Sequence, residues 1–210
     1  MSGRVLPPNA KPNGYSLSAI AQATANFNTS FPRVSVPYLP CLEGADDCAA
    51  LQILFSATGG DNSFSVSRGT ILYVPVILND DSPPIISSCP ITATTCADFP
   101  KVGDRHALLN YMFSPKEFGL RYSQIVVDGT VHNLGSDYLV EVKAPVPPGL
   151  ADGPGTQYMT LAAFLAPLSP GIHTVVIRGN ANGDDLVEVF TAIGFAVPFP
   201  FSITYSVTVH

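Results

Sequence analysis

Residues 122–134 have the sequence YSQIVVDGTVHNL, in which two apolar-rich arms flank an Asp-Gly pair. A two-residue type I′ turn needs positive φ at both central positions, and Asp128 and Gly129 tolerate that conformation. This turn pairs Val127 with Thr130 and Ile125 with His132, so His132 shares a face with Ile125 and Val127. The stretch therefore predicts an antiparallel hairpin within a β-rich fold.

Further strands are predicted on both sides of this hairpin. Residues 201–209 (FSITYSVTV) alternate between apolar or aromatic and hydroxyl-bearing side chains, so one face meets a core and the other meets water. Pro75 cannot donate to a sheet ladder, which places its strand at an edge or at a bulge. The other predicted strands cover residues 50–57, 70–78, 138–143, 158–166, 172–178 and 186–193.

The order of these elements decides the fold class. Short turns join the strands, and strands do not alternate with helices as they do in parallel α/β proteins. The pattern predicts an all-β fold, an antiparallel β-sandwich or jelly-roll with one to three short helices. Residues 1–14 predict an extended N-terminal arm able to pair with a neighbouring molecule's sheet edge, and residues 15–210 predict a single β-sandwich domain.

Three segments carry helix signals. Residues 16–27 (SLSAIAQATANF) place apolar side chains near helical spacing. Asp104 is a candidate N-cap for a helix that begins at Arg105. The sequence Ser114-Pro115-Lys116-Glu117 has the form of a capping box, which predicts one or two helical turns before Gly119.

The composition limits the classes of partner. Charged residues make up 12% of the chain and hydrophobic residues 46%, so the composition favours a packed core over charge-driven disorder. The formal net charge of −6 disfavours binding to phosphate backbones. We therefore expect no nucleic-acid partner. Because no apolar run reaches the length of a bilayer span, we also expect no membrane span.

Four cysteines occur as two pairs of equal spacing, Cys41/Cys48 and Cys89/Cys96. Four thiols permit three pairings. Zinc sites generally use closer pairs, so disulfides are the favoured interpretation, with buried free thiols and a metal site as alternatives. Disulfides imply an extracellular or cell-envelope location. Residues 1–16 show no signal peptide, so either the leader is absent from this chain or export uses none.

Two Asp- and Asn-rich loops contain the hard oxygen donors that calcium prefers. Asp80 and Asp81 follow one predicted strand, while Asn182, Asp184 and Asp185 precede another. Neither loop matches an EF-hand. Because Asx-rich turns commonly satisfy their own backbone, the two interpretations are a calcium site and a plain turn.

Two histidines are candidate site residues. His132 and His173 each share a strand face with apolar side chains. If those faces met, the imidazoles could bind a metal together with Asp128 or act in acid/base chemistry; a hydrogen-bonded structural role is the alternative. The chain lacks the common nucleophile, zinc-protease, phosphate-loop and dinucleotide motifs, so no catalytic residue is named.

A family resemblance rests on three stretches, GTILYVPVILND (69–80), VDGTVHNL (127–134) and PGIHTVVIRG (170–179). In this order they resemble a family of predicted secreted bacterial proteins that are β-rich and functionally uncharacterised. The resemblance covers about residues 40–210. It implies a β-rich fold and secretion, and it implies no catalytic residue.

Three functional hypotheses follow. The first is a secreted or surface-associated, non-catalytic binding or assembly protein, because low charge and an apolar-rich composition suit contact with partners, including other copies of the chain. The second is a jelly-roll metal-dependent enzyme that uses His132, His173 and Asp128. The third is a calcium-stabilised module that binds carbohydrate.

Overall fold

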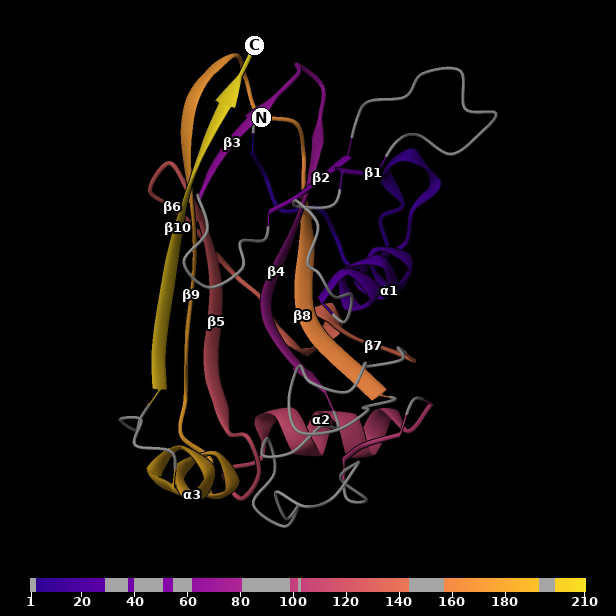
Figure 1. Cartoon of the computed structure of the whole chain (residues 1–210), viewed down its shortest axis with the longest axis vertical. Helices are drawn as coiled ribbons and strands as arrows, with labels where there is room; N and C mark the ends of the chain where they lie inside the picture. Colours follow the sequence, from indigo (N-terminus) through magenta and orange to yellow (C-terminus); the bar gives the residue numbers. More distant parts are fainter. Residues whose placement is uncertain are drawn as a thin grey trace.

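The computed structural model describes residues 3–28, 38–39, 51–54, 62–80, 99–101, 103–143, 157–192 and 199–210. Within these ranges, ten strands form two five-stranded sheets that face each other (Figure 1). Sheet A has the order β1 (Tyr38–Leu39), β2 (Leu51–Ile53), β4 (Ile71–Asp80), β8 (Gln157–Leu165) and β7 (Leu139–Lys143). Sheet B has the order β3 (Ser63–Val66), β10 (Phe199–Val209), β9 (Gly171–Ala181), β5 (Leu120–Val127) and β6 (Thr130–Asn133).

One hydrophobic core fills the space between the sheets. Val74 and Leu161 from sheet A belong to the same buried cluster as Ile125, Val175 and Val207 from sheet B. The alternation predicted for residues 201–209 is confirmed from Tyr205 on, because β10 directs Tyr205, Val207 and Val209 into the cluster. It is wrong at Ile203, which the pattern places on the same buried face and which is 37% exposed. Each buried aliphatic side chain contributes about 1.5–3 kcal/mol, so this shared core holds the two layers together.

The mostly β prediction is confirmed, but the all-antiparallel order is wrong. β2 pairs with β4 in parallel, and β3 pairs with β10 in parallel. β3 and β4 are joined by a tight turn at Ser67–Thr70, where the Thr70 hydroxyl donates to the Ser67 carbonyl oxygen (2.7 Å). Because this turn carries the chain from sheet B into sheet A, β3 and β4 each pair with a strand from elsewhere in the sequence.

Pro75 lies at a bulge in an interior strand. β4 runs between β2 and β8, and its register with β8 shifts between Pro75 and Ile77. The predicted bulge is therefore confirmed, whereas an edge position for this strand is wrong. The bulge accommodates the missing N–H donor inside the sheet.

Two of the predicted helices are present. The helix α1 (Leu17–Asn28) lies over the outer face of sheet A (Figure 1), where Leu17 and Ile20 pack with Tyr73 and Phe164. The helix α2 (Arg105–Phe113) begins as predicted, because the Asp104 carboxylate accepts a hydrogen bond from the Ala107 N–H (3.0 Å). Two short 3-10 turns are also present, η1 (Pro12–Gly14) and η2 (Ser136–Tyr138).

Two local predictions are wrong, both near the end of sheet B that lies at the bottom of Figure 1. Residues 115–118 form a turn rather than helical turns. Residues 186–193, predicted as a strand, lie largely in the helix α3 (Asp184–Ala192). Its sequence also places Leu186, Val189 and Phe190 at helical spacing, and acidic residues in its first turn favour a helix start.

The N-terminal arm pairs within its own chain. The Leu6 N–H donates to the Phe164 carbonyl oxygen (2.8 Å), and the Ala166 N–H donates to the Arg4 carbonyl oxygen (2.9 Å). Val5 thus forms a bridge with Leu165 on β8. This part of the arm therefore pairs with β8 of its own chain, and its pairing with a neighbouring molecule stays a prediction.

None of the helices in the described ranges combines the length and the apolar character that crossing a membrane requires.

Candidate functional site

The β5–β6 hairpin has the predicted turn and register. Asp128 and Gly129 adopt φ values of 47° and 83°, and Val127 pairs with Thr130 while Ile125 pairs with His132. Asp128 consequently occupies the first turn position, at one end of sheet B. From there its side chain reaches β9, the neighbour of β5.

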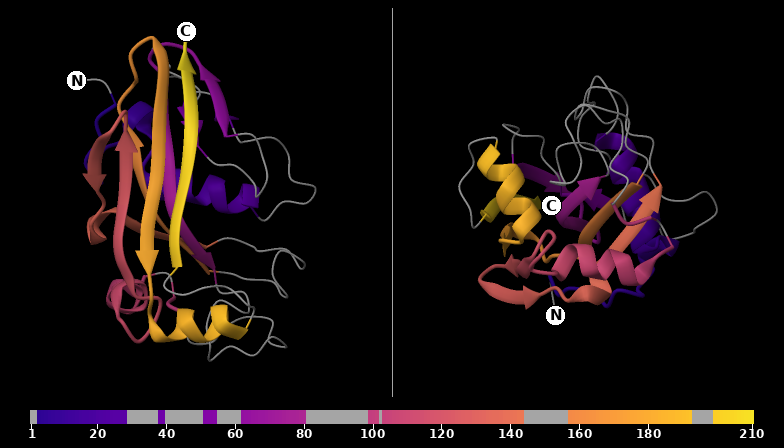
Figure 2. Two further views of the ribbon diagram at one scale, coloured as in Figure 1. Left: turned by 90° about the vertical axis from the view of Figure 1, so that its left-hand side faces the viewer. Right: turned by 90° about the horizontal axis from the view of Figure 1, so that it is seen from below.

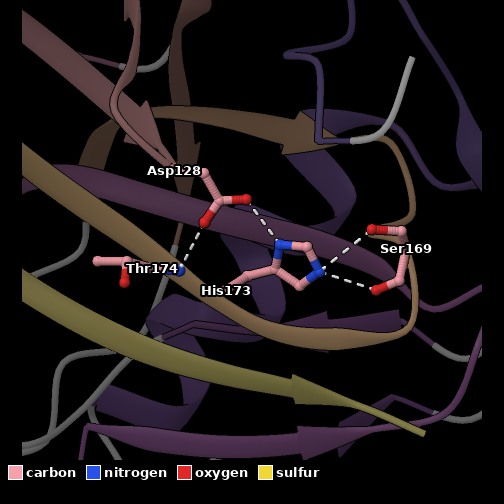
Figure 3. Close-up of polar contacts among 4 residues, drawn as sticks. All are labelled: Asp128, Ser169, His173 and Thr174. Atoms are coloured by element: carbon pink, nitrogen blue, oxygen red, sulfur yellow. Dashed lines mark hydrogen bonds and ion pairs between the residues drawn. The ribbon is translucent and has the colours of Figure 1, made fainter.

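Asp128 is joined to β9 through both carboxylate oxygens (Figure 3). Oδ2 lies 2.6 Å from Nδ1 of His173, and Oδ1 accepts a hydrogen bond from the Thr174 N–H at 2.9 Å. The Asp128 N–H in turn donates to the Thr174 carbonyl oxygen (2.9 Å). On the other side of the ring, Nε2 of His173 lies 2.8 Å from the Ser169 carbonyl oxygen. We call these four residues the His173 clasp.

The clasp geometry favours a doubly protonated imidazole. Nδ1 faces a carboxylate and Nε2 faces a carbonyl, and both of these oxygens can only accept. The hydrogen bond to Asp128 raises the pKa of His173, partial burial opposes it, and the Ser169 carbonyl and the charge of Asp128 add to the rise. Desolvation alone would raise the pKa of Asp128, but the hydrogen bonds from His173 and Thr174 and the imidazolium charge lower it overall.

A serine, a histidine and an aspartate thus meet, as they do in hydrolases, but the geometry suits a structural role. Ser169 Oγ lies 3.4 Å from Nε2, beyond the usual reach of a nucleophile–base hydrogen bond, while the carbonyl oxygen of the same residue lies at 2.8 Å. A nitrogen that donates to a carbonyl cannot accept the serine proton. The clasp therefore fastens the β5–β6 turn to β9 and to the β8–β9 connection.

One small depression includes the residue that precedes Ser169 of the clasp. A depression lined in part by Leu168, the neighbour of Ser169, has an empty volume of about 150 Å³. Small-molecule sites generally enclose roughly 300 Å³ or more. The depression is lined by Val66, Ser67, Thr70, Leu72, Leu168 and Val209, most of which are apolar. Among the described residues, this depression is too small and too apolar to hold a substrate for the clasp.

His132 does not join the other two predicted metal ligands. His132 on β6 pairs with Ile125 on β5, and Ile125 pairs with Ile177 on β9. Ile177 lies four residues along β9 from His173. This offset corresponds to about 13 Å along the strands and about 10 Å across two strand spacings. In the part of the chain that the structure describes, no group of three or more His, Cys, Asp or Glu side chains is placed to hold a metal ion.

The predicted calcium loop at residues 182–185 forms the start of α3. The Asp184 N–H donates to the Pro115 carbonyl oxygen (2.9 Å), and Arg121 donates through Nε to the Asn182 side-chain oxygen. Acidic residues in the first turn, Asp184 and Asp185, stabilise the positive end of the helix dipole. These contacts give the cluster a role in starting the helix.

The other predicted site residues are described only in part. Asp80 ends β4, and its side chain and Asp81 lie outside the described residues. All four cysteines (Cys41, Cys48, Cys89 and Cys96) also lie outside them, so their predicted disulfides stay a prediction.

Sequence reasoning missed an open main-chain edge on β6. The Leu134 N–H donates to the Ser123 carbonyl oxygen (2.9 Å), which fixes the alternation of hydrogen-bonded pairs along the hairpin. By this alternation, the N–H and C=O groups of Val131 and Asn133 point away from β5. No described strand pairs with β6 on that side. The two-residue turn already implied this alternation, so the sequence contained the signal.

The two sheets differ in how their outer faces are covered. α1 buries the outer face of sheet A. No helix of the described ranges crosses the outer face of sheet B, which faces the viewer on the left of Figure 2. That face carries exposed Tyr122, Val131 and Ile172, and Val131 is 46% exposed at the β6 edge. β6 forms one margin of the sheet (Figure 2).

A pH-dependent stability follows from the clasp. Because the pKa of His173 is raised from 6.5 and that of Asp128 is lowered from 3.8, the clasp contributes fully between these values. The contribution is lost as pH rises through the raised pKa or falls through the lowered one. We expect His173→Gln to lower the free energy of unfolding by about 1 kcal/mol at pH 5, since Asp128 is half exposed, and by less at pH 9.

Urea unfolding at both pH values measures this difference, with His106→Gln as the control because His106 is exposed on α2. An equal loss at pH 5 and pH 9 would contradict a charged clasp.

Comparison with known proteins gives no family assignment. No family model and no curated protein matches the chain, so the family resemblance stays a prediction. Among solved structures, the chain is similar to the cysteine protease inhibitor EhICP2 from Entamoeba histolytica, with 14% identity, a TM-score of 0.31, and coverage of 76% of this chain and 96% of that one. It is also similar to amebosin, with 9% identity, a TM-score of 0.28, and coverage of 75% and 97%. At these TM-scores neither likeness carries an argument about fold or function.

Proposed function

We propose that this protein is a secreted or surface-associated, non-catalytic assembly protein whose copies associate through the β6 edge of its β-sandwich. The observation that carries the proposal is the set of outward main-chain groups at Val131 and Asn133, which have no partner in the described part of the chain. Unpaired groups on an edge strand are a template for another strand.

The side chains of β6 supply no protection for this edge, which is limited only by its length of four residues. Edge strands commonly avoid pairing by carrying lysine, proline or inward-pointing charges. β6 has the sequence Thr130-Val131-His132-Asn133, with no proline and no permanently charged side chain. Two copies can therefore approach at this strand despite the net charge of −6 on each chain.

The β5–β6 hairpin, which bears the edge, is held in place at its turn and on its outer face. The His173 clasp fastens its turn to β9. On the outer face, Arg178 donates to the Gln124 side-chain oxygen (2.7 Å), and Gln124 donates to that of Asn133 (2.8 Å). Preorganisation of this kind reduces the entropy lost on association, which supports a binding role for a short strand.

A secreted location is part of the proposal. It rests on the two cysteine pairs, since disulfides persist in oxidising compartments. The non-catalytic character is supported by the clasp, in which both imidazole nitrogens already face hydrogen-bond acceptors.

Proline at position 131 tests the edge directly. The Val131 N–H points away from β5, so Val131→Pro removes one outward donor from each copy and leaves the hairpin ladder intact. Loss of two hydrogen bonds from a pair of copies, each worth about 1 kcal/mol, raises the dimer dissociation constant about thirtyfold. Size-exclusion chromatography with light scattering, run over a range of concentrations, measures this change.

Val131→Thr is the matched control, because threonine keeps the N–H and the preference for strands. We expect the unmodified protein and Val131→Thr to form a dimer and Val131→Pro to shift toward one chain. A single-chain mass for the unmodified protein at every concentration, or equal dissociation constants for the two variants, would overturn the proposal.

A further inference from the structure

We infer that two copies of the chain pair antiparallel through β6 about a two-fold axis at His132, so that Val131 of each copy faces Asn133 of the other. The inference rests on the proposed self-association and specifies its partner, register and symmetry. It makes a ten-stranded sheet from two copies of the five-stranded sheet B.

The hydrogen-bond alternation selects this register. Only Val131 and Asn133 have outward N–H and C=O groups within β6, because Thr130 and His132 use theirs toward β5. With the axis at His132, both outward residues of both copies enter hydrogen-bonded pairs, which gives four main-chain bonds. An axis at Val131 would pair Val131 with its equivalent and place Asn133 opposite Gly129, outside the strand. An axis at Asn133 would likewise place Val131 opposite Gly135.

The ends of β6 allow the approach. In this register Gly129 of one copy lies opposite Gly135 of the other. A Cβ atom built at either glycine has no described atom within 4 Å, so both ends face open space. The carboxylate of Asp128, next to Gly129, is already bonded to His173, which offsets its charge.

The symmetry limits the assembly to two copies at this edge. A two-fold pairing is isologous, because each copy presents the same strand to the other, and it uses up both β6 edges. The exposed Val131 side chains then lie beside Asn133 of the other copy, on the outer face of the joined sheet. A dimer rather than an open fibre is the expected product.

The register predicts which position cross-links. His132 of each copy faces its equivalent at a non-hydrogen-bonded pair, where Cα atoms lie about 4.5 Å apart. The two Val131 Cα atoms lie about 9 Å apart, because they are offset by two residues. A disulfide needs a Cα separation below about 7 Å. His132→Cys should therefore form a covalent dimer on mild oxidation, and Val131→Cys should not.

Non-reducing gel electrophoresis measures the cross-linked fraction, with the unmodified protein alongside to account for the four native cysteines. We expect His132→Cys to exceed both Val131→Cys and the unmodified protein at least tenfold, and Val131→Pro added to His132→Cys to reduce the cross-link. A dimer by light scattering with equal cross-linking at the two positions would overturn the register and leave self-association intact. Light scattering that shows one chain for the unmodified protein and for reduced His132→Cys would overturn both proposals.

Discussion

Ile20→Asp is expected to lower the free energy of unfolding by at least about 4 kcal/mol. Ile20 is 1% exposed and packs in the cluster that includes Ile71, Tyr73 and Phe164 on the outer face of sheet A. The substitution removes aliphatic contacts worth about 2–5 kcal/mol and places a carboxylate among apolar side chains. The total stability of a domain is about 5–15 kcal/mol, so most of it is lost.

Thermal unfolding followed by circular dichroism tests this expectation, with a fall in Tm of about 10 °C or more. Ala19→Asp is the control, since Ala19 is exposed one position earlier and a carboxylate in the first turn suits the helix dipole. If both variants melted with the unmodified protein, α1 would not cover sheet A in solution.

The covering of sheet A is what leaves sheet B as the proposed contact layer. Both sheets carry apolar residues on their outer faces, but α1 buries those of sheet A under Leu17 and Ile20. On sheet B, Tyr122 and Val131 stay exposed. The sequence predicted α1, but the choice of the sheet it covers depends on packing that a local pattern does not encode.

Local chemistry was sufficient for the hairpin. Asp128 and Gly129 accept the positive φ angles that a two-residue turn requires, and this turn fixes every pair from Val127–Thr130 to Gln124–Asn133. The Asp104 cap is predictable for the same reason, because its hydrogen bond spans three residues. In both cases the deciding contacts lie within a few positions of each other.

Long-range pairing was not predictable in this way. The parallel partners β2 and β4 are separated by β3, which belongs to the other sheet. The segment at residues 186–193 fits both a strand and a helix, since its apolar residues satisfy both periods. The contacts of the preceding loop with residues 115–119 favour the helix, and they join segments more than sixty residues apart.

The candidate site was half predictable. Sequence reasoning named Asp128 and His173 and expected a third partner in His132. The third partner is instead the Ser169 carbonyl oxygen, a main-chain group that no residue type indicates. This partner changes what His173 can do. Its imidazole donates a hydrogen bond from both nitrogens, so neither nitrogen is left to bind a metal ion.

The close approach of Gly183 to the turn at residues 115–119 explains how α3 starts. The Gly183 N–H donates to the Phe118 carbonyl oxygen (3.0 Å), and the Asn182 N–H donates to that of Gly119 (3.2 Å). A Cβ at position 183 would lie 1.9 Å from the Glu117 carbonyl oxygen. The obstructing atom is backbone, so the side chain has no room unless the two segments separate.

Gly183→Ala is therefore expected to cost about 3 kcal/mol, at the upper end of the range for overpacking, and to lower Tm by about 6–12 °C. Gly135→Ala is the matched control, because its Cβ meets no described atom within 4 Å and its φ of −87° suits any residue. Calorimetry of the two variants measures the difference. If Gly183→Ala melted together with Gly135→Ala, the docking of α3 on this turn would be wrong, and residues 182–185 would again be open to interpretation as a cation loop.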